Sequence, residues 1–110
     1  MREIKKIVTE ISGRRGKNCY YVLCQAVEAA SGCQPEEVQM KAVCATIRGS
    51  VNMTDAAVSR ALARAADDIW EYGNRERLQE IYGRPVLERP SPKELVNVLA
   101  QYVWQEHTTR

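Results

Sequence analysis

The chain has 110 residues, of which 45% are hydrophobic and 27% are charged, and its formal net charge is +2. This length suits one domain with a single core, and the composition is globular rather than disordered. No apolar run is long enough to span a membrane, and the amphipathic N-terminus lacks the apolar core of a signal peptide. We therefore expect one cytoplasmic domain over residues 1–110, with no membrane partner.

Apolar residues recur with helical spacing, and no strand-like alternation interrupts them. The first predicted helix ends near Gly13–Gly16. Its inward stripe is Ile4, Ile7, Val8 and Ile11. The second helix covers Cys19–Ala30. A third is expected to start at Pro35, because proline suits a first helical turn and two glutamates follow it. It runs through Cys44 and leads into a short helix at Ala45–Ser50.

The second half of the chain predicts three further helices. A long one covers Thr54–Tyr72 and is closed by Gly73–Asn74, and a short one covers Arg75–Tyr82. Three prolines make Arg84–Pro92 an extended connector, and the last helix runs from about residue 91 to about residue 106. The sequence thus predicts an all-α fold, a compact bundle of about six helices.

The long helix has two different faces. Its inward stripe is Val58, Leu62, Ala65 and Ile69. At about 100° per residue, Arg60 and Arg64 fall opposite this stripe and have alanines around them. Two arginines among small side chains let a helix approach another surface closely, as a helix entering the DNA major groove must.

The turn before the long helix contains residues that favour a tight connection between two packed helices. Asn52 tolerates the left-handed backbone conformation that a tight turn needs. Thr54 can cap the long helix, and Asp55 suits its first turn, near the positive end of the helix dipole. This is the spacing of a helix-turn-helix over about residues 41–72.

The cysteines and the histidine do not form a metal-ligand pattern. The four cysteines, at positions 19, 24, 33 and 44, contain no CxxC pair, and the only histidine is His107. We expect buried thiols, above all Cys24 and Cys44. The chain also lacks a Ser/His/Asp set, a phosphate-binding loop and a paired-carboxylate site, so we expect no enzyme, no metal and no cofactor.

Several short motifs occur in a characteristic order. They are Val51-Asn-Met-Thr, Val58-Ser-Arg-Ala, Trp70, Gly73-Asn74, Ile81-Tyr-Gly and the closing Lys93-Glu-Leu with Gln105-Glu-His. This order resembles the C-terminal DNA-binding effector domain of the stage-zero sporulation response regulator, the transcription factor of endospore-forming bacteria. The resemblance covers residues 4–107 and is weaker before residue 40.

The resemblance implies a sequence-specific transcription regulator that binds promoter boxes in double-stranded DNA. It also implies a homodimer on tandem sites and contact with an RNA polymerase sigma factor. The implied recognition helix is Asp55–Trp70, in which Arg60 stands where the family has an arginine that reads guanine. Arg64 stands where the family has a histidine that faces DNA.

The chain also departs from the family. Ala57 replaces an arginine and Ser59 replaces a glutamate, both near the bases, and Ala63 replaces another basic residue. These changes remove charge and base contacts, so a different target sequence and a lower affinity are expected. The family's receiver domain has no counterpart here, which leaves an excised effector domain or a stand-alone relative.

Several candidate residues have two interpretations. Arg60 and Arg64 either read bases or are solvated charges, and Arg64 could instead pair with Asp67 or Asp68 along the helix. Thr54 is a cap whose hydroxyl could also reach a phosphate.

The remaining basic candidates are expected at the DNA backbone. Lys41 and Arg48 lie on the supporting helix, which crosses the backbone in this kind of motif. The loop with Arg14, Arg15 and Lys17 either contacts phosphate or is simply solvated.

A second class of function also fits the sequence. Three acidic residues follow the arginines on the long helix. Together with the losses of charge described above, they fit a helical protein-interaction module that kept the fold and lost DNA binding. Such a module would modulate a related regulator or a sigma factor.

Overall fold

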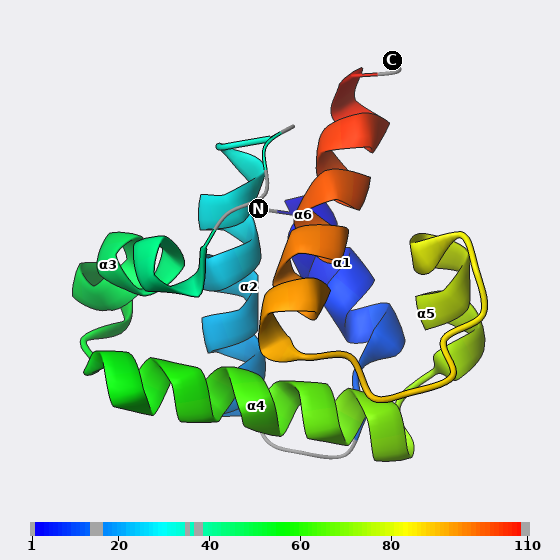
Figure 1. The fold of residues 1–110 in the computed structure, drawn as a ribbon, viewed down its shortest axis with the longest axis horizontal. Helices are drawn as coiled ribbons and strands as arrows, with labels where there is room; N and C mark the ends of the chain where they lie inside the picture. Colours follow the sequence, from blue (N-terminus) through cyan, green and yellow to red (C-terminus); the bar gives the residue numbers. More distant parts are fainter. Residues whose placement is uncertain (1, 14–16, 35, 37–38, 109–110) are drawn as a thin grey trace.

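A computed structural model describes residues 2–13, 17–34, 36 and 39–108, and these residues form six helices and no strand. The helices are α1 (Arg2–Ile11), α2 (Lys17–Ser31), α3 (Met40–Val51), α4 (Asp55–Tyr72), α5 (Arg75–Tyr82) and α6 (Pro92–Thr108). They pack into a compact globule with a radius of gyration of 12.7 Å (Figure 1). The predicted all-α class is confirmed.

Helix α2 is the centre of the fold, and it packs against α6, α4, α3 and α1. In Figure 1, α2 and α6 stand side by side, and α4 runs across the same end of both. Helix α3 lies beside α2 and leads into the N-terminal end of α4, while α5 lies near α1 at the other end of α4. Helix α4 therefore forms one side of the molecule.

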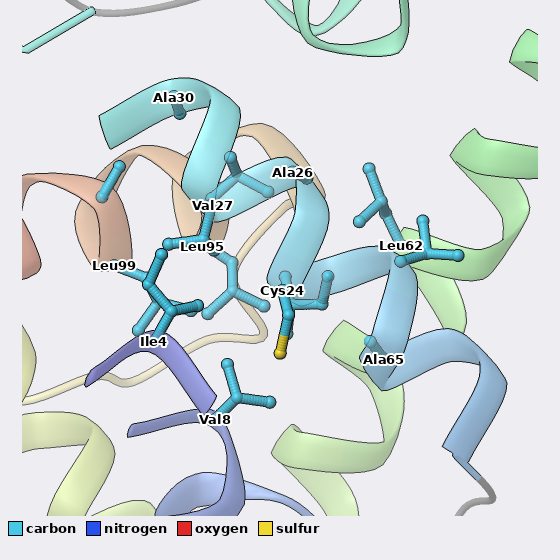
Figure 2. Packing of buried hydrophobic residues seen from close by; sticks show 14 of the residues in the cluster. Ile4, Val8, Cys24, Ala26, Val27, Ala30, Leu62, Ala65, Leu95 and Leu99 are labelled. Atoms are coloured by element: carbon cyan, nitrogen blue, oxygen red, sulfur yellow. The ribbon is translucent and has the colours of Figure 1, made fainter. Parts of the chain in front are cut away.

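The predicted inward stripes of the first and the long helix are confirmed, since all their residues are buried. Figure 2 shows side chains of α1, α2, α4 and α6 that meet in one core, among them Val8, Val27, Leu62 and Leu99. Cys24 also belongs to this core, and burial raises the pKa of its thiol. The predicted burial of Cys24 and Cys44 is confirmed.

The prediction for the third helix is wrong at its start. Helix α3 begins at Met40 after an extended Gln39, and it continues without a break to Val51, so the separate short helix at Ala45–Ser50 is absent. A turn precedes it, in which the backbone N–H of Glu36 donates to the carbonyl of Cys33 at 3.3 Å. Met40 packs against the core, whereas the preceding Gln39 is extended and exposed, so the helix begins where its apolar side meets the core. The predicted start at Pro35 lies outside the described residues.

The other predicted helix ends agree closely with the structure. Helix α5 has the predicted bounds, with the side chain of Asn74 accepting from the N–H of Arg77 at 3.0 Å. Helix α6 starts at Pro92, capped by the Ser91 hydroxyl, and continues to Thr108, two residues beyond the prediction. Within the described ranges, none of the helices combines the length and the hydropathy needed to cross a bilayer.

Candidate nucleic-acid interface

The turn between α3 and α4 has the predicted local chemistry. Asn52 adopts the left-handed conformation, with φ 53° and ψ 49°, and its N–H donates to the carbonyl of Arg48 at 2.9 Å. The Thr54 hydroxyl accepts from the N–H of Ala57 at 3.1 Å, which caps α4. Both predicted roles are confirmed, and together they fix where the first turn of α4 lies against α3.

Arg60 and Arg64 lie on the outer side of α4. Val58 and Leu62 are fully buried on the opposite side, whereas both arginines are exposed. Within the described part of the chain, neither guanidinium forms an ion pair or a hydrogen bond. The two positive charges are therefore available to a ligand.

Small side chains surround the two arginines. Ala56 and Ser59 are exposed, and Ala57 and Ala63 are half-buried. None of these four side chains extends as far from the helix axis as an arginine does. The N-terminal half of α4 can therefore approach a flat or grooved surface closely, with the guanidinium groups reaching it first.

Two basic residues lie on α3, which precedes the turn. Lys41 and Arg48 are seven positions apart, so they share one side of the helix, and both are exposed. The Nη1 atom of Arg48 lies 3.9 Å from Oδ1 of Asp55. Such an exposed pair is weak, so Arg48 stays accessible. Arg14, Arg15 and the Lys17 side chain lie outside the described residues.

Two acidic residues of α4, Asp67 and Asp68, are engaged by distant segments of the chain, whereas Glu71 is exposed and forms no ion pair with the described residues. Asp67 forms an ion pair with Arg89 of the α5–α6 connector, 22 residues away in sequence. Asp68 is only 2% exposed and accepts a hydrogen bond from the Tyr20 hydroxyl. The structure shows no ion pair between Arg64 and either carboxylate, so the predicted alternative of pairing along the helix is wrong.

The Tyr20–Asp68 contact belongs to a polar cluster that fastens α4 to the start of α2. The N–H of Gly13 donates to the Tyr20 hydroxyl at 2.9 Å. Burial, followed by the hydrogen bond to Asp68, raises the pKa of Tyr20 well above its ordinary value. The sequence interpretation treated Asp68 as a surface charge, and it had no signal for a partner 48 residues away.

The end of α4 also makes direct backbone contact with the end of α1. The N–H of Asn74 donates to the carbonyl of Ile11 at 3.4 Å. A Cβ atom on Gly73 would lie 2.2 Å from that carbonyl oxygen, so only glycine fits there. Next to this contact, the guanidinium of Arg75 lies 3.8 Å from the centre of the Trp70 ring. Trp70 is thus covered on one face within the molecule.

Sequence reasoning missed Arg89, whose segment was interpreted only as a proline-rich connector. Arg89 lies beside α4 because of the path that the connector takes, and the spacing of residues in the sequence does not indicate that path. In the described residues, no group of three His, Cys, Asp or Glu side chains gathers as metal ligands would. Comparison with protein-family models, curated proteins and solved structures finds no match for this chain.

Proposed function

We propose that the protein is a sequence-specific DNA-binding transcription regulator in which α3, the turn and α4 act as a helix-turn-helix. The observation that carries the proposal is the exposed pair of Arg60 and Arg64, free of ion pairs to the described residues and set among small side chains. In this function α4 enters the major groove, and Arg60 reads guanine through two parallel hydrogen bonds.

The charge distribution supports this function more than the net charge of +2 does. Asp68 is buried with Tyr20, and Asp67 is paired with Arg89, so neither opposes a phosphate as a free surface carboxylate would. Glu71 is exposed and forms no ion pair with the described residues, but it lies in the last turn of α4, eleven positions after Arg60. Lys41 and Arg48 add exposed positive charge on α3, where a supporting helix meets the DNA backbone.

The partners of this function are the ones that the resemblance implies. They are promoter boxes in double-stranded DNA, a second copy of the chain on tandem boxes and an RNA polymerase sigma factor. Base reading by Arg60 and Arg64 sets the sequence preference, with Ser59 and the cap residue Thr54 close to the backbone. Ala57 adds no charge at the bases and leaves room for them.

The test begins with the selection of bound duplexes from a random library by the unaltered chain. The selected duplex and a scrambled duplex are then titrated with Arg60→Ala and with Lys6→Ala, which removes an exposed charge from α1. We expect Arg60→Ala to lose about 10- to 100-fold in preference for the selected duplex, as one bidentate arginine–guanine contact provides. We expect Lys6→Ala to keep that preference. Equal preference in the two variants would contradict the assignment of Arg60.

A protein-interaction module is the second candidate, because the outer face of the N-terminal half of α4 has only two positive charges and the uncharged residues Ala57, Ser59 and Ala63. Salt dependence separates the two candidates, since each neutralised phosphate steepens the fall of affinity with salt by about 0.9 in logarithmic slope. A steep slope supports the regulator. A flat response, or no binding to duplex DNA, supports the module.

A further inference from the structure

Arg89 reaches the same face of α4 as the two free arginines. Asp67 follows Arg60 by seven positions, so the two residues point in nearly the same direction, about 10.5 Å apart along the helix axis. Arg89 forms an ion pair with Asp67, and its guanidinium therefore lies at that outer face. The connector that carries it passes beside the C-terminal half of α4 (Figure 1).

The spacing between Arg60 and Asp67 is close to the width of the DNA major groove, about 12 Å. When the N-terminal residues of such a helix contact bases, residues two turns later approach the sugar–phosphate backbone. A free carboxylate at this place would repel phosphate. Arg89 neutralises it through Nη1, and a guanidinium has five N–H donors, so donors remain for a further acceptor. The Arg89 side chain is 59% exposed, which leaves these donors accessible.

We propose that Arg89, oriented by Asp67, binds a backbone phosphate at the edge of the groove that α4 enters. This inference rests on the proposed function and adds a contact from a segment outside the helix-turn-helix. Arg48 and Arg89 then bind the backbone at opposite ends of α4, and together they set its register on the duplex. The contact carries no base information, so it strengthens binding to every sequence equally.

The same connector provides a matched control. Arg84 is 60% exposed and also forms an ion pair, with its Nη2 atom 3.3 Å from Oε1 of Glu94 on α6. Its guanidinium lies 5.4 Å from the centre of the Tyr82 ring, at the end of α5 and away from Asp67. Arg84→Ala therefore removes the same charge from the same segment without touching the outer face of α4.

The experiment measures affinity by fluorescence anisotropy for the selected duplex and for a scrambled duplex, over about 50–200 mM salt. For Arg89→Ala we expect the logarithmic salt slope to become shallower by about 0.9, the value for one phosphate contact. We also expect the affinity for both duplexes to fall by the same factor. For Arg84→Ala we expect the slope of the unaltered chain. Equal slopes for the two variants would overturn the inference.

A double variant separates phosphate binding from simple neutralisation of Asp67. If Arg89 only neutralised that carboxylate, Asp67→Ala combined with Arg89→Ala would bind with the affinity and slope of the unaltered chain, and the inference would be wrong. We expect the double variant to keep the shallower slope instead.

The outcomes also distinguish this inference from the proposed function. If the unaltered chain binds no duplex, both are wrong. If it binds and Arg60→Ala loses its selectivity, but Arg89→Ala behaves like Arg84→Ala, only the role of Arg89 is wrong.

Discussion

The two halves of α4 carry pairs of opposite charge, and only the pair in the C-terminal half is engaged by distant segments of the chain. In the N-terminal half, Arg60 and Arg64 lie in solvent and form no ion pair with the described residues. In the C-terminal half, Asp67 and Asp68 are held by residues from the connector and from α2. The difference shows that the role of a charge on this helix depends on which distant segment passes beside it.

The two halves are also anchored differently. The N-terminal half is held by apolar contacts on one side and by the Thr54 cap, and its outward arginines, Arg60 and Arg64, form no hydrogen bond or ion pair with the described residues. The C-terminal half touches α1 and α2 through hydrogen bonds and a backbone contact at Gly73. We therefore expect substitutions in the C-terminal half to change stability, and substitutions in the N-terminal half to change binding.

The largest effect is expected from Gly73→Ala. The new Cβ atom would lie 2.2 Å from the Ile11 carbonyl oxygen, so α1 and α4 would have to move apart. We expect a loss of about 3 kcal/mol in the free energy of unfolding, measured by urea denaturation, as strong overpacking produces. Gly49→Ala is the control, because nothing lies within 4 Å of its Cβ position in α3. It should instead gain about 0.5–1 kcal/mol.

The next largest effect on stability is expected from Asp68→Ala, and its neighbour Asp67 provides the comparison. Asp68→Ala removes a buried acceptor and leaves the Tyr20 hydroxyl without it, so we expect a loss of about 2–3 kcal/mol in unfolding free energy. Asp67→Ala removes an exposed partner of Arg89 and should change stability by no more than about 0.5 kcal/mol. Similar losses of unfolding free energy in the two variants would contradict the prediction that the buried carboxylate stabilises the fold more than the exposed one.

A smaller effect is expected at alkaline pH from Tyr20. Its pKa is raised in the folded chain, whereas in the unfolded chain the phenol ionises near its ordinary value of 10.0. Above pH 10 the unfolded state therefore releases a proton that the folded state retains, and stability falls as pH rises. Tyr20→Phe should lose about 1 kcal/mol at neutral pH and show a shallower fall above pH 10. Unfolding curves at several pH values test this, and a parallel fall in both proteins would contradict it.

The smallest effect on stability is expected from the double variant of Arg60 and Arg64, the residues whose loss should most reduce binding. Arg60→Ala combined with Arg64→Ala removes two exposed side chains, so the unfolding free energy should stay within about 0.5 kcal/mol of the unaltered chain. Helical content, measured by circular dichroism, should be unchanged. A clear loss of stability would mean that these arginines contribute to the fold, and it would weaken the contrast between the two halves.

Local chemistry made much of the structure predictable. Asn52 and Thr54 act through their own backbone or a residue within four positions, so the turn and the start of α4 could be predicted from residue type. The inward stripe of α4 follows from helical periodicity, because burying one apolar side is the main source of stability for such a helix. The start of α3 was mistaken because proline permits a first helical turn but does not require one.

The sequence by itself determined the all-α class, most helix boundaries and the outward position of Arg60 and Arg64, since these depend on interactions between near neighbours in the chain. Only the tertiary structure decided that Asp68 is buried against Tyr20, that Gly73 lies against Ile11 and that Arg89 reaches Asp67. These contacts join segments 22 or more residues apart. Such pairings depend on how whole helices pack, because burial of the shared core determines which distant side chains meet.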